Sequence, residues 1–182
     1  KGQIAMEDVR RELMAQAAQM ERTGLPLTHV DSHQHMHMLP GVIDISLDVA
    51  ASLNLDAVRI SRTPLFTAFA GMGQLIGRLG LFTLSELSLW KAKRRHFRVP
   101  DHFEGIVAGE AVHEGHFLHI LKDLRPGTTE VMMHPGTDNE KLIPACDWEH
   151  DFEAEMQAIV SPKVRRMIAD KAVKIVNYRD LK

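Results

Sequence analysis

Apolar residues along this chain follow two alternating patterns. Spacings of three and four residues predict amphipathic helices, and these fall at 5–23, 42–55, 112–124, 148–159 and 163–171. Short runs rich in valine and isoleucine predict strands between the helices, at 27–32, 57–61, 101–107, 128–134 and 173–178. Strands that alternate with helices indicate a parallel sheet, open or closed into a barrel, and we therefore predict an α/β fold.

Residues 65–98 break this alternation with an apolar, glycine-dotted helical stretch. It ends in the basic segment KAKRRHFR, at 91–98. Cations suit the negative end of a helix dipole, but beside Phe66, Phe69 and Trp90 they also suit an anionic lipid surface. Both interpretations stay open. We predict a single domain over 1–182 with a helical insertion at about 65–98.

The composition limits the partners of the protein. The chain has 182 residues, 45% of them hydrophobic, which is enough to bury a core. Lys and Arg total 22 against 24 Asp and Glu, so we expect no nucleic-acid partner. Cys146 is the single cysteine, which excludes an internal disulfide and suits a reducing compartment. We expect a cytoplasmic protein, whose only membrane association would be peripheral, through residues 65–98.

The segment LTHVDSHQHMHMLPG, at 27–41, holds four of the eleven histidines. In a strand, Asp31, His33 and His35 would face one side near its carboxyl end, where ligands collect in parallel α/β folds. Packing is a poor explanation for this cluster, because each buried imidazole nitrogen needs a partner. We interpret the cluster as functional, with metal ligation as its simplest form. The spacing does not decide which imidazoles bind.

Two further residues lie where predicted strands end. His134 precedes Pro-Gly, and its ring would serve as a metal ligand or a proton donor. Arg59, in VRISR, would hold a carboxylate or polarise a carbonyl, with an ordinary ion pair as the alternative. Asp101 and His102 form a weaker candidate, for which a structural role is favoured.

These stretches carry a resemblance to a known family. THVDSHQHMHMLPGV resembles the signature of the YdjC-like carbohydrate deacetylases, and VRISRTPL, TTEVMMHPG and VKIVNYRDL follow in the family order. The order of PLFTAFAG and RRHFRVPDHFEGI is more similar to the hopanoid-biosynthesis-associated (HpnK-like) branch. The resemblance covers nearly the whole chain from the first helix onward.

The resemblance implies a (β/α) barrel of the polysaccharide-deacetylase type with a divalent metal, Mg²⁺ or Zn²⁺, held by one Asp and two His. His33 would be a ligand, Asp31 would orient it, and His134 would be the general acid. We place Arg59 with His134 as catalytic. We expect substrate contacts from Arg62, His35 and His37; the two histidines would alternatively stabilise an oxyanion or simply pack.

The implied activity is hydrolysis of an N-acetyl group on an amino sugar or a glycolipid, linked to hopanoid lipid biosynthesis. A non-catalytic glycan-binding or lipid-binding accessory protein is the alternative, and a metal-dependent phosphoesterase is less favoured. Family members begin with a strand that carries an Asp-Asp pair, followed by a strand with the second ligand His, and neither occurs here. We therefore expect an incomplete barrel that is inactive alone and forms a homo-oligomer through its unpaired sheet edge.

Overall fold

The computed structural model describes residues 4–62, 72–106 and 111–182. Its Cα positions group into two compact units, one made of 1–100 with 176–182 and the other of 101–175. Each unit is described by itself. The single domain remains a prediction.

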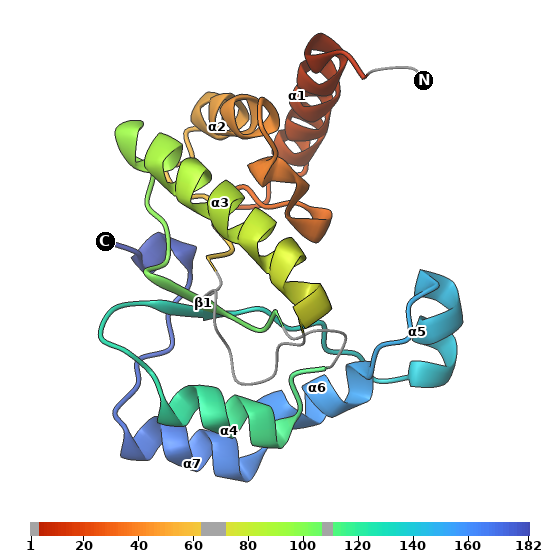
Figure 1. Cartoon of the computed structure of the whole chain (residues 1–182), viewed down its shortest axis with the longest axis vertical. Coiled ribbons are helices and arrows are strands. Elements are labelled where there is room, and N and C mark those ends of the chain that lie inside the picture. Colours follow the sequence, from red (N-terminus) through yellow and green to blue (C-terminus); the bar gives the residue numbers. More distant parts are fainter. Residues whose placement is uncertain (1–3, 63–71, 107–110) are drawn as a thin grey trace. The chain divides into compact units, whose positions relative to one another are not determined.

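The first unit packs helices around an apolar core. It contains α1 (Met6–Arg22), η1 (His33–Met38), α2 (Val42–Ser52), α3 (Met72–Arg94) and η2 (Tyr178–Asp180) (Figure 1). Helices α1 and α2 meet where Ala17 packs with Ile45 and Val49. A larger core gathers around the fully buried Ile43 and Leu47 of α2. The predicted helices at 5–23 and 42–55 are confirmed, because their apolar positions form these contacts.

Three extended segments of this unit run parallel. The Val30 amide donates to the Ala57 carbonyl (3.3 Å), and the Arg59 amide donates to the Val30 carbonyl (3.0 Å). On the other side the Val58 amide donates to the Arg98 carbonyl (3.1 Å). The structure records these pairings as isolated bridges, Val30 with Val58 and Ala57 with Arg98. The strands predicted at 27–32 and 57–61 therefore occur as short parallel pairings.

Cations at the end of α3 form ion pairs within the same unit. Lys91 Nζ lies 2.6 Å from Asp44 Oδ2, and Arg95 Nη2 lies 2.8 Å from Asp48 Oδ1. The Arg94 guanidinium lies over the Trp90 ring, 4.8 Å from its centroid. None of the helices that the structure describes is long and apolar enough to cross a membrane. Phe66 and Phe69, part of the lipid interpretation, lie outside the described residues.

The second unit combines a two-stranded sheet with four helices. β1 (His102–Glu104) runs parallel to β2 (Thr129–Val131). The helices are α4 (Glu114–Lys122), α5 (Asn139–Cys146), α6 (Phe152–Val160) and α7 (Pro162–Asp170). Helix α4 lies beside α6 and α7 (Figure 1). Ser161 caps α7 by accepting hydrogen bonds from the amides of Lys163 and Val164. Because Ser161 also follows the last residue of α6, one helix ends and the next begins at this residue.

Asp101 and His102 join the two strands of this sheet. Asp101 Oδ2 accepts from the Thr128 amide at 2.8 Å, and His102 Nε2 lies 3.0 Å from the Pro126 carbonyl oxygen. A Cβ at Gly127, where φ is +110°, would meet Asp101 Oδ2 at 2.6 Å. These contacts hold the turn before β2 against the start of β1, which agrees with the structural role favoured for Asp101 and His102.

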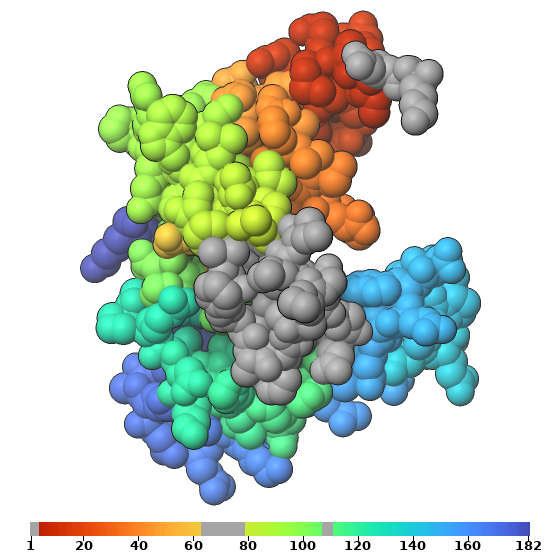
Figure 2. All heavy atoms as spheres, viewed as in Figure 1, coloured from red at the N-terminus to blue at the C-terminus, as the bar shows by residue number. Residues whose placement is uncertain are grey.

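Two sequence expectations differ from the structure. The strand predicted at 173–178 is wrong, because this stretch forms no ladder and Ile175 is 78% exposed. Helix α5 was not predicted: it contains Pro144 and none of its residues is buried, so it lacks an apolar pattern. Figure 2 shows α5, in light blue, at the surface. The described residues form a mixed α/β, mostly helical structure with a small parallel sheet, and they do not show a barrel.

Candidate functional site

The histidine segment leaves the extended conformation at His33. Residues Gln34 and His35 have φ values of 51° and 59°, in the left-handed region, within the 3₁₀ segment η1. Two successive non-glycine residues in this region are costly and persist only where surrounding contacts hold them. The expectation that His35 shares a strand face with Asp31 is therefore wrong, because the strand alternation stops at Ser32.

His37 is the buried member of the segment, with 2% exposure. Its Nε2 lies 2.6 Å from the Arg59 carbonyl oxygen, and its Nδ1 lies 2.8 Å from Ser32 Oγ. Because a carbonyl oxygen only accepts, Nε2 carries the proton and Ser32 donates to Nδ1. The backbone amide of His37 also donates to Ser32 Oγ, at 2.8 Å. Of the three roles expected for His37, this geometry favours packing.

Asp31 makes an ion pair with Arg59, between Oδ2 and Nη1. Its Oδ1 accepts from the Ser32 amide at 2.7 Å and lies 4.0 Å from His37 Nδ1. The ion-pair alternative for Arg59 is thus present in the structure. These contacts place the Asp31 carboxylate against Arg59 and His37, and no contact between Asp31 and the His33 ring appears in the described part of the chain.

The other predicted residues of this unit lie nearer its surface. His33 is exposed, and its ring has no hydrogen-bond partner within the described ranges. His35 Nδ1 lies 2.7 Å from Oγ of the buried Ser61. Arg62 is exposed and its Nε lies 2.5 Å from Glu86 Oε1. Arg62 thus lies at the surface, whereas the His35 ring is half-buried against Ser61.

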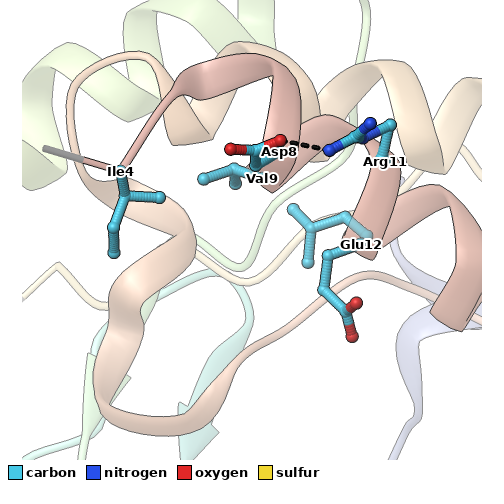
Figure 3. Close-up of a pocket in the computed structure, with 6 residues that line it drawn as sticks. Ile4, Asp8, Val9, Arg11 and Glu12 are labelled. Atoms are coloured by element: carbon cyan, nitrogen blue, oxygen red, sulfur yellow. Dashed lines mark hydrogen bonds and ion pairs between the residues drawn. The ribbon is translucent and has the colours of Figure 1, made fainter. Parts of the chain in front are cut away.

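Two cavities border the first unit. An apolar cavity of about 500 Å³ lies between α1, α2 and the segment that precedes η1, with Asp31 and His37 at its polar end. A shallow depression of about 530 Å³ lies on the first turns of α1 (Figure 3). There Asp8 pairs with Arg11 one turn along the helix, and both are exposed. The depression brings together no histidine or catalytic pair, so it is not the candidate site.

The second unit brings His134 together with His150 and Glu155. One ligand atom from each of the three lies within 4.8 Å of the others. Glu155 is 1% exposed, on α6, and its Oε1 lies 3.2 Å from His150 Nε2. The same carboxylate accepts from the Val112 amide at 2.8 Å and, through Oε2, from the His134 amide. Glu155 therefore fixes the backbone that carries the predicted general acid.

The rings of Trp148 and His150 contact the ring of His134. Its ring meets Trp148 edge to face at 5.0 Å between centroids, and His150 at 5.4 Å. Trp148 stacks on His150 at 4.1 Å with 23° between the planes, and Phe152 packs edge-on against both. The imidazole of His134 thus lies beside an aromatic wall.

The His134, His150 and Glu155 side chains offer a set of ligand atoms that could hold a divalent cation. Bonds of about 2.1 Å at tetrahedral angles place neighbouring ligand atoms about 3.4 Å apart, close to the 3.2 Å between His150 Nε2 and Glu155 Oε1. His150 Nε2 is buried and makes no hydrogen bond within the described structure. This is the only group of three or more such ligands that the described residues contain, and His33 does not belong to it.

Sequence reasoning missed His150 and Glu155. A signal was present, because Phe152, Glu155 and Ala158 recur at three-residue spacing and are the buried residues of α6. A carboxylate at a core position of a helix needs internal partners, which marks it as structural or functional.

A comparison with known families decides the relationship. The model of the YdjC-like proteins matches residues 1–170. The chain belongs to the YdjC-like family.

Curated relatives of this YdjC-like chain share one name. A protein of Thermoanaerobacter pseudethanolicus named carbohydrate deacetylase is 27% identical over 177 residues, which cover 97% of this chain and 61% of the relative. The carbohydrate deacetylase of Mus musculus is 29% identical over 205 residues, with coverages of 99% and 64%. That of Homo sapiens is 28% identical over 206 residues, with coverages of 99% and 61%. The YdjC-like chain thus spans about three fifths of the length of these relatives.

Proposed function

We propose that the protein is a carbohydrate deacetylase that hydrolyses the N-acetyl amide of an amino sugar or a glycolipid. The observation that carries this proposal is that relatives named carbohydrate deacetylase align over 97% or more of this chain. The HPG and DSH elements, with His134 and His33, supply residue types suited to amide hydrolysis. The barrel fold expected from the resemblance belongs to the same proposal.

His134 is assigned to the leaving group. Water adds to the carbonyl carbon, the C–N bond breaks, and the departing amine takes a proton from the His134 imidazole as acetate is released. The position of His134 after β2 supports this role, because Glu155 holds its backbone and Trp148 and His150 restrict its ring. A ring restricted in this way donates its proton in one direction.

His33 is assigned as a ligand of a divalent metal, Mg²⁺ or Zn²⁺. When bound, such an ion polarises the carbonyl and lowers the pKa of water. The exposure of His33 supports this assignment, since its ring nitrogens are open to an ion. One imidazole does not hold a metal tightly, so further ligands are required. The His134, His150 and Glu155 group is the competing metal site, and the two assignments predict different mutants.

The remaining residues are assigned to substrate and support. His35 and Arg62 would contact the sugar, Arg62 from an exposed position and His35 from a half-buried position beside Ser61. Arg59 would steady charge at the carbonyl while Asp31 balances it. His37 would hold the Arg59 carbonyl in place. A hopanoid-linked glycolipid as substrate and peripheral membrane contact through 65–98 are the finer parts of this proposal.

The test combines acetate release from N-acetylated chitooligosaccharides with elemental analysis, on the protein as its gene encodes it. His33→Ala should abolish acetate release and remove the bound ion. His119→Ala, at an exposed histidine on α4, should leave both unchanged. Loss of the ion in His150→Ala but not in His33→Ala would move the metal to the competing site. Absence of acetate release with every N-acetylated sugar would overturn the deacetylase proposal.

A further inference from the structure

Trp148 is a large exposed aromatic side chain beside the proposed proton donor. It is 42% exposed, and its ring centroid lies 5.0 Å from that of His134. Asp147, at the end of α5, has φ 47° and ψ 45°, a left-handed conformation that turns the chain out of the helix. The Trp148 amide donates to the Ile143 carbonyl at 3.4 Å. The backbone that presents Trp148 is therefore tied to the helix end.

The indole of Trp148 is supported from one side. The His150 ring stacks on it at 4.1 Å, and the Phe152 ring meets it edge-on at 5.6 Å. His150 is itself buried and lies against the Glu155 carboxylate. Despite these contacts, Trp148 keeps 42% of its surface exposed. Trp148 is thus held by neighbouring rings and still has surface exposed to solvent.

We propose that the open surface of Trp148 is the platform on which the sugar ring lies while its amide is hydrolysed beside His134. This rests on the proposed function. A pyranose ring presents C–H groups on one face and hydroxyl groups at its rim, so it packs on a flat, electron-rich ring with its polar groups left free. Tryptophan offers the largest such surface at low cost in side-chain entropy. The edge-to-face position of His134 places a proton donor at the border of this platform.

The residues that follow Trp148 supply hydrogen-bonding partners for a carbohydrate. Glu149, His150 and Asp151 line a cavity of about 640 Å³ together with Asn139. The side-chain Nδ2 of Asn139 donates to Asp151 Oδ1 at 2.8 Å. Carboxylate oxygens such as those of Asp151 accept hydrogen bonds from sugar hydroxyl groups. The size of the cavity suits a small ligand.

The two tryptophans of the chain allow a direct test with triacetylchitotriose. The other is Trp90, which is 53% exposed, has the Arg94 guanidinium over one face and belongs to the first unit, whereas the residues of the proposed platform belong to the second. In Trp90→Phe, where Trp148 is the single fluorophore, the sugar should change the tryptophan emission in a saturable way. In Trp148→Phe, where Trp90 remains, it should not. An equal change in both variants, or a change in Trp148→Phe alone, would overturn the platform.

Calorimetric titration with the same sugar measures the contribution of the platform. Trp148→Leu should weaken binding at least tenfold, Trp148→Tyr should recover most of the affinity, and Trp90→Leu should bind like the unchanged protein. Recovery in Trp148→Tyr would show that the weaker binding of Trp148→Leu does not come from misfolding. Unchanged affinity in Trp148→Leu would overturn the platform but would not contradict the proposed deacetylase activity. Binding that depends on Trp148 without acetate release from any sugar would instead refute the proposed activity alone.

Discussion

Glu155 Oε1 lies 3.2 Å from His150 Nε2, and both side chains are buried within the second unit. A buried carboxylate is costly unless its lone pairs are satisfied. Here Glu155 accepts from the backbone amides of Val112 and His134, so one side chain on α6 joins the segment before α4 to the segment after β2. The carboxylate thus connects parts of the unit that are distant in sequence.

Removal of this carboxylate should destabilise the protein. Glu155→Ala leaves the Val112 and His134 amides without their acceptor and removes the carboxylate beside buried His150, and we expect a loss of about 3–5 kcal/mol in the free energy of unfolding, measured with urea. Glu155→Gln keeps the shape and one acceptor, so its loss should be smaller. Glu149→Ala, at an exposed carboxylate nearby, should stay within about 0.5 kcal/mol of the unchanged protein. Equal stability of Glu155→Ala and Glu149→Ala would contradict the connecting role.

His134→Gln should reduce kcat by about 10²–10⁴-fold, because proton donation to the leaving amine is lost while sugar contacts remain. We expect KM to change little. His119→Gln serves as the matched control on α4. A change confined to KM would assign His134 to substrate binding instead.

Helices were predictable in this chain and strands were only partly so. The apolar spacing of α1 and α2 corresponds to the buried Ala17, Ile43 and Leu47, and local pattern suffices for such elements. A strand depends on its neighbour: Val30 and Val58 pair in isolated bridges, whereas Ile175 has the same β-forming character and lies exposed. The apolar pattern of the sequence does not reveal which strands find partners.

The candidate site shows the same division. His134 and the histidine segment were visible as residue types at strand ends. The turn at His35 was not, because alternation assumes an extended backbone and the φ of 59° depends on contacts with distant residues such as Ser61. The meeting of His134 with His150 and Glu155 also depends on tertiary packing. The sequence signal of this cluster was the carboxylate of Glu155 at a core position of α6.

Replacing His37 should lower the stability of the protein, whereas replacing His33, four residues earlier, should leave its stability nearly unchanged. His37→Ala leaves Ser32 Oγ and the Arg59 carbonyl without their ring partner, and we expect a loss of about 2–4 kcal/mol in the free energy of unfolding. His33→Ala removes an exposed ring, and stability should change by less than about 0.5 kcal/mol in metal-free buffer. Urea unfolding of both variants checks the contrast. A large loss in His33→Ala would make His33 a structural residue.

Asp48 should make the first unit sensitive to acid. Burial alone would raise the pKa of its carboxyl, but hydrogen bonds from Arg10 and Arg95 outweigh burial and hold the pKa below its usual value. A carboxyl with a lowered pKa in the folded state stabilises the protein above its unfolded pKa, and this stabilisation is lost as the pH falls through the folded pKa. Asp48→Asn should therefore lower the melting temperature at pH 7.

The difference between Asp48→Asn and the unchanged protein should shrink as the pH falls below the unfolded value of about 3.9. Since the Asp48 side chain is partly exposed, solvent screens these ion pairs and the loss at pH 7 should be about 1 kcal/mol or less. High salt should reduce it further, because screening weakens exposed pairs. Glu149→Gln, at an exposed carboxylate of the second unit, is the control and should leave the melting temperature at pH 7 unchanged. A difference that persists unchanged at low pH would show that Asp48 acts through packing and not through its charge.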